Sequence, residues 1–165
     1  GLCEEQDFDL PHTIALSGTT RFASVRSGLA ELPSSGLVAI HDGVRPFASP
    51  SLIEACFQMA ERRGAAIPAI PLTDSLRIRI GDEVSQAVDR SAYVSVQTPQ
   101  TFRLETIKRA YEAPFSPTFT DDASVYEASE QGTISLIPGE ATNIKLTTPL
   151  DLKLAELLLD QDPLP

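Results

Sequence analysis

A repeated switch between two hydrophobic periodicities is the feature that most constrains this fold. Residues 12–18, 36–42 and 65–72 are short apolar runs of the kind found in buried strands. Residues 20–32 and 49–64 instead repeat apolar side chains at helical spacing. Short links join these segments in the order strand, helix, strand, helix, strand. This order favours an α/β fold with a doubly wound, mostly parallel sheet.

Both helical segments carry their own boundary signals. Thr20 is a candidate cap of the first, and Ser49 followed by Pro50 begins the second, which Gly64 ends. At 165 residues with 42% hydrophobic content, the chain is long and apolar enough for one core. We therefore expect residues 1–165 to form a single domain.

The periodicity changes in residues 74–102, where apolar and polar side chains alternate around a turn at 81–83. This alternation is typical of an antiparallel hairpin. Leu76, Ile78 and Ile80 give the hairpin an apolar face. Because an isolated two-stranded hairpin is marginally stable, we expect it to pack on another subunit.

The remaining segments complete the α/β pattern. We expect helices near 103–112 and 121–131, a strand at 133–139 and an amphipathic helix at 148–160. Thr120 is the candidate cap of the helix near 121–131.

Charge and cysteine content exclude several classes of protein. The net charge of −10 argues against a nucleic-acid partner, but a phosphorylated small molecule can still bind where cations gather or a metal is recruited. The apolar runs are too short to cross a membrane, and the acidic segment 1–10 does not resemble a signal peptide. Cys3 and Cys56 lack metal-ligand spacing and are interpreted as reduced thiols of a cytoplasmic protein.

A polar cluster directly follows the strand at 36–42. Asp42 and Arg45 lie in "HDGVRPF", with Gly43 and Pro46 shaping the bend. Open parallel sheets bind their ligands beyond the carboxyl ends of the strands, which is where this acid and this arginine lie. A salt bridge within the loop explains the same residues without a ligand.

Two other clusters are equally open to a structural explanation. Gly18 begins a strand-to-helix turn whose free N–H groups suit an anion, although a plain capped helix has the same features. Arg90 in "VDRS" is either a strand-end charge or a ligand-binding group.

The C-terminal half adds two more clusters. Asp121 and Asp122 occupy a first helical turn, where the helix dipole alone favours acids. Lys145 lies between Ile144 and Leu146, and is either exposed or partly withdrawn from water at a sheet end.

Motifs of nucleophilic hydrolases and zinc enzymes are not seen. The sequence has no Cys-His pairing, no GxSxG, no HExxH and no Walker A loop. These two classes therefore have little support.

Taken in order, the clusters resemble one enzyme family. The segments "GTTRFASVRSGL", "HDGVRPF", "VDRS", "VQTPQTF", "FTDDASVYE" and "NIKLTTPLDLKLAELLL" are similar to successive motifs of 2-C-methyl-D-erythritol 4-phosphate cytidylyltransferase. The resemblance implies a Rossmann-like nucleotidyltransferase sheet with a protruding β-arm at 74–97 that forms a homodimer. It also implies cytidylyl transfer from CTP to 2-C-methyl-D-erythritol 4-phosphate, with release of pyrophosphate, in non-mevalonate isoprenoid synthesis.

The resemblance also implies roles for individual residues. The nucleophile is a phosphate oxygen, so no general base is required, and Mg²⁺ on the triphosphate is the usual charge-neutralising group. Asp42 would lie at the metal and Lys145 near the α-phosphate. Ser75, Arg90 and Thr98 would reach the substrate phosphate from the neighbouring subunit. The expected substrate-binding residues are Arg45, Ser75, Thr98 and Thr120, and the expected nucleotide-binding residues are Gly18, Ser24, Asp42, Gly43 and Lys145.

The chain also departs from the family pattern. It resembles the part of the family that follows an N-terminal glycine-rich loop, after about 65–70 residues or two βα units. The expectation is that this chain alone is incomplete for activity. Ser17 and Gly18 stand where the family has two glycines, which changes the backbone expected beside the nucleotide.

Two alternatives remain open. Ribitol 5-phosphate cytidylyltransferase has the same fold and chemistry, although "TDDASVYE" and "VQTPQ" favour the methylerythritol enzyme. A non-catalytic dimerisation or binding domain is an alternative from another class, and the missing triphosphate loop is its support.

Overall fold

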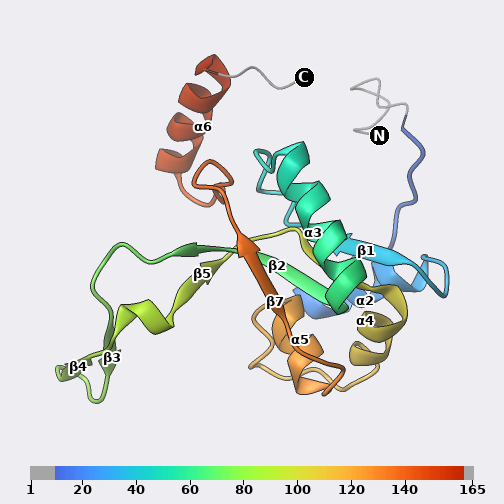
Figure 1. Cartoon of the computed structure of the whole chain (residues 1–165), viewed down its shortest axis with the longest axis horizontal. Coiled ribbons are helices and arrows are strands. Elements are labelled where there is room, and N and C mark those ends of the chain that lie inside the picture. Colours follow the sequence, from blue (N-terminus) through green and yellow to red (C-terminus); the bar gives the residue numbers. More distant parts are fainter. Residues whose placement is uncertain (1–9, 162–165) are drawn as a thin grey trace.

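The computed structural model describes residues 10–161. Strands there form a five-stranded sheet and a separate two-stranded one (Figure 1). The main sheet comprises β1 (Leu37–Ile40), β2 (Ala65–Pro71), β5 (Val94–Val96), β6 (Gln100–Arg103) and β7 (Ser135–Pro138). The α-helices are α2 (Arg21–Ala30), α3 (Pro50–Arg63), α4 (Leu104–Ala110), α5 (Asp122–Ala128) and α6 (Pro149–Gln161).

Strand direction confirms the α/β class and refines the predicted order. β2 pairs in parallel with β7, whereas β6 pairs antiparallel with both β1 and β2. β1, β2 and β7 therefore run in one direction, as the mostly parallel prediction required. The runs at 36–42 and 65–72 are not direct neighbours, because β6 is inserted between them.

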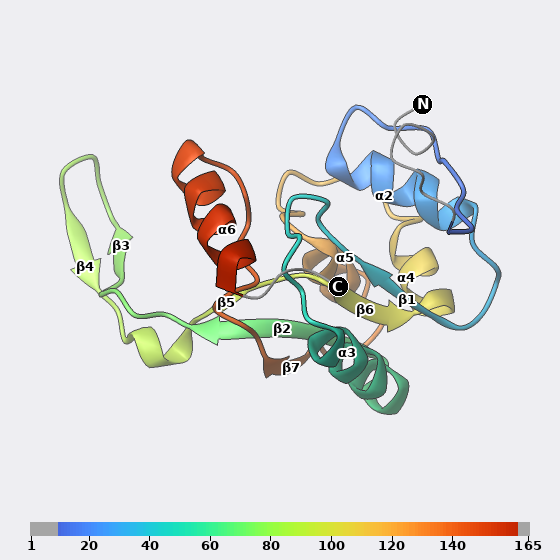
Figure 2. The same ribbon diagram turned by 90° about the horizontal axis from the view of Figure 1, so that it is seen from above.

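The helices cover both faces of this sheet. Helix α3 lies on one face, and α2, α4 and α5 lie on the other (Figures 1 and 2). Phe22 of α2 stacks on Tyr111 with ring centroids 4.7 Å apart, over the buried Phe102 of β6. Leu52 and Cys56 of α3 form a second buried cluster with Ile137 of β7. The sheet is thus fixed from both sides, which holds the ends of its strands in place.

The predicted helix boundaries are largely confirmed. The Thr20 side chain accepts a hydrogen bond from the Ala23 amide, and Ser49 caps α3 in the same way. Gly64 ends α3 with a φ of 93°, a conformation that favours glycine. The cap of α5 was predicted wrongly: Asp121, one residue after Thr120, forms the capping box with Ser124.

The first predicted strand is also corrected. Residues 12–18 have no regular structure, and the side chains of Ile14 and Leu16 are 82% and 85% exposed. An alternating pattern becomes a strand only where a neighbouring strand accepts its backbone hydrogen bonds.

The two cysteine predictions have different outcomes. Cys56 is a buried free thiol, and burial raises its pKa to about 11, which fits an unreactive cysteine. Cys3 and most of the acidic segment 1–10 lie outside the described residues.

The predicted hairpin is real but shorter than expected. Strands β3 (Arg77–Arg79) and β4 (Ser85–Ala87) pair antiparallel, and project away from the main sheet (Figures 1 and 2). A short 3₁₀ helix (Arg90–Ala92) follows, and the chain then returns to the main sheet as β5 and β6. Among residues 10–161, helices long and apolar enough to cross a membrane are absent.

Candidate active site

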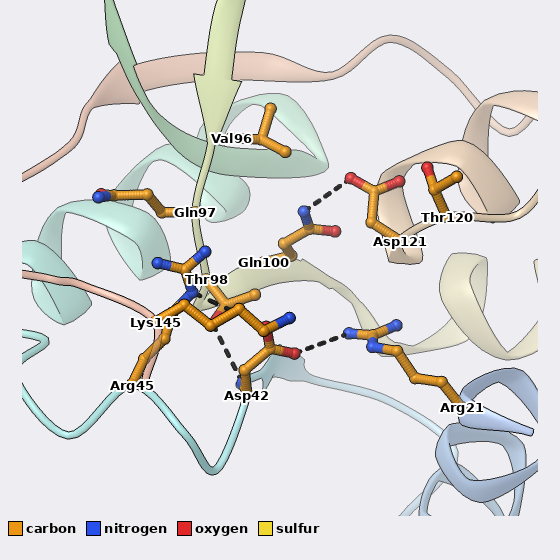
Figure 3. A pocket seen from close by; sticks show the side chains of 10 residues that line it. All are labelled: Arg21, Asp42, Arg45, Val96, Gln97, Thr98, Gln100, Thr120, Asp121 and Lys145. Atoms are coloured by element: carbon orange, nitrogen blue, oxygen red, sulfur yellow. Dashed lines mark hydrogen bonds and ion pairs between the residues drawn. The ribbon is translucent and has the colours of Figure 1, made fainter. Parts of the chain in front are cut away.

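A cavity of about 150 Å³ opens beyond the end of β1. Its lining comes from the loop after β1, the β5–β6 segment, the starts of α2 and α5, and the segment before α6 (Figure 3). The residues that line it are Arg21, Asp42, Arg45, Val96, Gln97, Thr98, Gln100, Thr120, Asp121 and Lys145. Five residues predicted from the sequence are therefore brought together: Asp42, Arg45, Thr98, Thr120 and Lys145.

Asp42 is the centre of a charge cluster. Lys145 Nζ lies 2.9 Å from Asp42 Oδ2, and Arg45 Nε lies 3.7 Å from the same oxygen. Arg21 Nη2 approaches Oδ1 at 3.6 Å. Three cations thus surround one carboxylate whose side chain is only 15% exposed.

These cations keep Asp42 ionised. Burial raises the pKa of its carboxyl, but the hydrogen bond and charge of Lys145, with the charges of Arg21 and Arg45, outweigh burial. The net effect is a pKa below the ordinary value. The cluster therefore presents fixed positive charge around a permanently negative centre at neutral pH.

The loop after β1 is held rigidly. The Arg45 amide donates to the Asp42 carbonyl at 3.0 Å, and Leu146 donates its amide to the Val44 carbonyl. Arg45 Nη1 donates to the Asn143 carbonyl at 2.8 Å, which ties this loop to the segment carrying Lys145. The loop after β1 and the segment that carries Lys145, which are distant in sequence, therefore form one structural unit.

Thr98 is joined to this loop by its hydroxyl. Thr98 Oγ1 accepts from the Asp42 amide at 3.0 Å and lies 3.0 Å from His41 Nδ1. His41 Nε2 lies 2.8 Å from the Arg45 carbonyl, which only accepts, so Nε2 carries the proton. Thr98 was expected to reach the substrate from the neighbouring subunit, but it lines the cavity of its own chain. His41 had no predicted role.

Buried amide side chains connect the other walls. Gln100 Nε2 donates to Asp121 Oδ2 at 2.9 Å, while Gln100 Oε1 accepts from the Ala123 amide. Gln97 Nε2 donates to the Glu140 carbonyl at 2.8 Å. Sequence reasoning gave neither glutamine a role, although both lie in the quoted segment "VQTPQTF", which joins β5 to β6.

Arg21 and Asp122 form a further pair that sequence reasoning missed. Arg21 Nη1 and Nη2 donate to the two oxygens of Asp122 at 2.9 and 2.6 Å. The hydrogen bond and charge of Asp122 raise the pKa of Arg21, although burial opposes this. Asp122 was predicted only as a first-turn acid, yet its side chain is fully buried.

The predicted nucleotide-binding residues outside the charge cluster do not line the cavity. Gly18 donates its amide to Ser24 Oγ at 3.0 Å, at the start of α2. A Cβ at Gly18 would lie 2.3 Å from the Ala23 Cβ, so close approach requires glycine there. Gly43 lies in the loop after β1, where a Cβ would meet open space.

The two arm residues lie elsewhere. Ser75 precedes β3, and Arg90 begins the 3₁₀ helix, where its Nη1 donates to the Thr73 carbonyl. Neither residue lines the cavity. The structure therefore does not bring Ser75 and Arg90 together with Asp42 within one chain.

The expected metal role of Asp42 can be tested on its surroundings. Within residues 10–161, clusters of three or more His, Cys, Asp or Glu that could hold a metal are absent. Mg²⁺ is commonly bound by one or two carboxylates together with substrate phosphates. Asp42 fits as one such ligand, provided that the nucleotide supplies the others.

The chain is similar to proteins of one family. The family model described as "IspD: 2-C-methyl-D-erythritol 4-phosphate cytidylyltransferase" matches residues 5–161. A 2-C-methyl-D-erythritol 4-phosphate cytidylyltransferase of Porphyromonas gingivalis is 54% identical over 158 residues, covering 96% of this chain and 71% of that protein. The protein of the same name from Bacillus velezensis is 39% identical and covers 88% of this chain and 64% of its own length.

Solved structures agree with these relatives. The 4-diphosphocytidyl-2C-methyl-D-erythritol synthase of Anaerococcus prevotii superposes with a TM-score of 0.86 at 31% identity, covering 96% of this chain and 76% of that one. The 2-C-methyl-D-erythritol 4-phosphate cytidylyltransferase of Thermus thermophilus gives 0.75 at 37% identity, covering 87% and 71%. The α/β arrangement of this chain is thus shared with these proteins over most of its length.

Proposed function

The chain belongs to the 2-C-methyl-D-erythritol 4-phosphate cytidylyltransferase family, and from this we propose that it transfers a cytidylyl group from CTP to 2-C-methyl-D-erythritol 4-phosphate. The reaction releases pyrophosphate and serves isoprenoid precursor synthesis. Among the structural observations, the convergence of Lys145, Arg45 and Arg21 on Asp42 carries this proposal.

This cluster suits phosphoryl chemistry between two anions. The attacking group is already a phosphate oxygen, so the reaction needs positioning and charge neutralisation rather than an activated nucleophile. Cations fixed in a partly buried cavity stabilise developing charge without reorganising during the reaction. The absence of a predicted Ser, Cys or His nucleophile is consistent with this chemistry.

Lys145 is the proposed catalytic cation. Its Nζ is held 2.9 Å from Asp42, and its side chain remains 46% exposed, so it is both oriented and accessible. We assign it to the α-phosphate of CTP. Arg45, Thr98 and Thr120 line the same cavity and are assigned to the acceptor phosphate and sugar.

The nucleotide base and ribose are assigned to the start of α2. Gly18 and Ser24 lie there, joined by a hydrogen bond from the Gly18 amide to Ser24 Oγ. The close packing of Gly18 on Ala23 brings backbone near the surface, which supports recognition through main-chain groups. Gly43 is assigned to the nucleotide side of the loop after β1, next to Asp42.

Mg²⁺ is proposed as the cofactor, with Asp42 as its protein ligand. When bound to the triphosphate, Mg²⁺ neutralises phosphate charge. Lys145, Arg45 and Arg21 hold Asp42 in position for this role.

We also propose a homodimer in which the arm, residues 74–97, completes the neighbouring active site. Arg90 and Ser75 do not line their own cavity, so their proposed contact with the acceptor requires a second subunit. Ile78, Ile80 and Val84 on the hairpin are 53%, 60% and 58% exposed, which supports burial against a partner. The arginine fork suits bidentate binding of a phosphate.

The alternatives receive less support. The relatives described above carry the methylerythritol name, so ribitol 5-phosphate is not favoured as acceptor. Family membership likewise disfavours a non-catalytic binding domain. A cytoplasmic location without nucleic-acid or membrane partners is proposed on the net charge of −10 and the free buried thiol of Cys56.

The test is a direct assay of the whole protein. Purified protein is incubated with CTP, Mg²⁺ and 2-C-methyl-D-erythritol 4-phosphate, and pyrophosphate release is followed. Parallel reactions contain ribitol 5-phosphate, or no acceptor. We expect release that depends on the methylerythritol acceptor. If pyrophosphate is released with ribitol 5-phosphate but not with the methylerythritol acceptor, ribitol 5-phosphate is the acceptor. Pyrophosphate release in the reaction that contains no acceptor would contradict the proposal.

A further inference from the structure

The pair of Arg21 and Asp122 is more elaborate than a helix cap requires. Asp122 is fully buried, accepts two hydrogen bonds from Arg21, and accepts a third from the Tyr111 hydroxyl at 2.5 Å. A carboxylate in such surroundings is tolerated only when it is paired and hydrogen-bonded. The two-point contact also fixes the plane of the guanidinium. Asp122 therefore holds the guanidinium of Arg21 in one orientation.

That orientation directs Arg21 toward the cavity. The guanidinium has five N–H donors, and Asp122 uses two of them. Its Nη2 also lies 3.6 Å from Asp42 Oδ1, and the Arg21 side chain is 39% exposed (Figure 3). An arginine that served only to pair Asp122 would not need donors beside Asp42.

Three cations and two carboxylates, Asp42 and Asp121, line the cavity, and Asp122 pairs with Arg21 outside this lining. Lys145 pairs closely with Asp42 at 2.9 Å, and Arg45 and Arg21 lie farther off at 3.7 and 3.6 Å. At these distances both arginines still interact with Asp42, but neither donates a hydrogen bond to it. A phosphate placed here would use the donors that remain.

We propose that Arg21 binds a phosphate group of a substrate, and that Asp122 is the positioning residue that holds Arg21 in the cavity. This inference rests on the proposed function, since phosphate is the group shared by CTP and the acceptor. The competing explanation is purely structural: the pair would only tie the start of α2 to the start of α5. If the pair has only this structural role, its removal should lower the stability of the protein and leave the substrate affinity unchanged.

The first experiment compares Arg21→Gln with Arg26→Gln in the whole protein. Arg26 lies on the same helix and does not line the Asp42 cavity, so it controls for the loss of one charge. We expect Arg21→Gln to raise the KM for CTP or for the acceptor at least tenfold, and Arg26→Gln to leave both near wild type. The substrate whose KM rises identifies the source of the phosphate. Unchanged KM values for both substrates would overturn the proposal.

The second experiment compares Asp122→Asn with Glu127→Gln, an exposed acid on the same helix. We expect Asp122→Asn to raise the same KM as Arg21→Gln. The double variant should show no further increase, because Asp122 acts through Arg21. A lower Tm with unchanged KM would leave only the structural role. If Asp122→Asn does not fold, Tyr111→Phe removes one hydrogen bond from the same carboxylate and should raise the same KM by a smaller factor.

The third experiment separates this inference from the proposed reaction. Calorimetry measures the binding of inorganic pyrophosphate to the wild type and to Arg21→Gln, without turnover. We expect the variant to bind at least fivefold more weakly, whether or not cytidylyl transfer is observed. Equal affinities would overturn the role of Arg21 even if the wild type is an active transferase.

Discussion

The cavity around Asp42 and the arm that carries Arg90 are built in opposite ways. Around Asp42, residues from five parts of the chain are joined by hydrogen bonds such as those of Thr98 and Gln100. In the hairpin, contacts are local, as between Arg77 and Ser85, and the strand side chains are exposed. The cavity is held by contacts within its own chain, whereas the contacts that hold the hairpin are local.

The two regions would contribute to a shared site in different ways. A cavity preorganised by its own fold can present fixed charges before substrate arrives. In the proposed dimer, an arm with an exposed apolar face would gain its functional position only on association. Changes in the cavity should therefore act within one subunit, and changes in the arm should act through the dimer.

The largest expected effect is at Lys145. Lys145→Ala should lower kcat by ~10²–10³, the scale of one lost charge-stabilising donor, and Lys145→Gln should recover little. The side chain is 46% exposed, so the fold should survive, as circular dichroism would show. Lys153→Ala on α6 is the matched control. Wild-type turnover in Lys145→Ala at saturating CTP and Mg²⁺ would exclude the catalytic role.

Arg90 tests the arm in the same assay. Arg90→Ala should lower turnover by ~10², because the acceptor phosphate loses an orienting contact. CTP affinity, measured by calorimetry, should stay near wild type. Arg79→Ala, on the same hairpin, is the control and should be active. Parallel loss of CTP affinity and activity would remove Arg90 from the acceptor side.

The apolar face of the arm should control the assembly of the dimer. Ile78→Ser combined with Ile80→Ser should raise the dimer dissociation constant tenfold or more, since each buried isoleucine contributes about 1.5–3 kcal/mol. The Tm of the isolated subunit should change little, because both side chains are exposed in one chain. Light scattering across a concentration series measures this shift. A wild-type monomer at micromolar concentration would refute the dimer.

The smallest expected effect is a pH-dependent stability difference at Asp42. Its pKa is lowered in the folded protein, because Lys145 and the two arginines outweigh the effect of burial. The stabilisation is therefore present above the unfolded pKa of about 3.9 and is lost as the pH falls through the folded pKa. Asp42→Asn should lower the free energy of unfolding at pH 7 by up to about 1 kcal/mol, the scale of a partly exposed ion pair. The gap to wild type should shrink below about pH 4. Urea unfolding at several pH values measures this difference in free energy. Asp82→Asn, at an exposed position on the hairpin, is the control. A difference between Asp42→Asn and wild type that does not depend on pH would contradict this account.

Local signals in the sequence were sufficient for much of the fold. Thr20, Ser49 and Gly64 mark helix ends through their own caps and backbone preferences, and the structure confirms them. Asp42 and Arg45 were placed at a strand end because the apolar run stops directly before them. These features depend on residues a few positions apart, so they can be predicted from short segments of the sequence.

Other features were decided only by the tertiary structure. Residues 12–18 alternate like a strand but do not form one, and β6 enters between β1 and β2 from a distant part of the chain. The pairing of Arg21 with Asp122 joins residues 101 positions apart. No local pattern encodes such a pair, because Asp122 meets Arg21 and Tyr111 only when the fold buries its carboxylate. Which strands pair and which charges are buried together depends on how the whole chain packs. No short segment of the sequence contains that information.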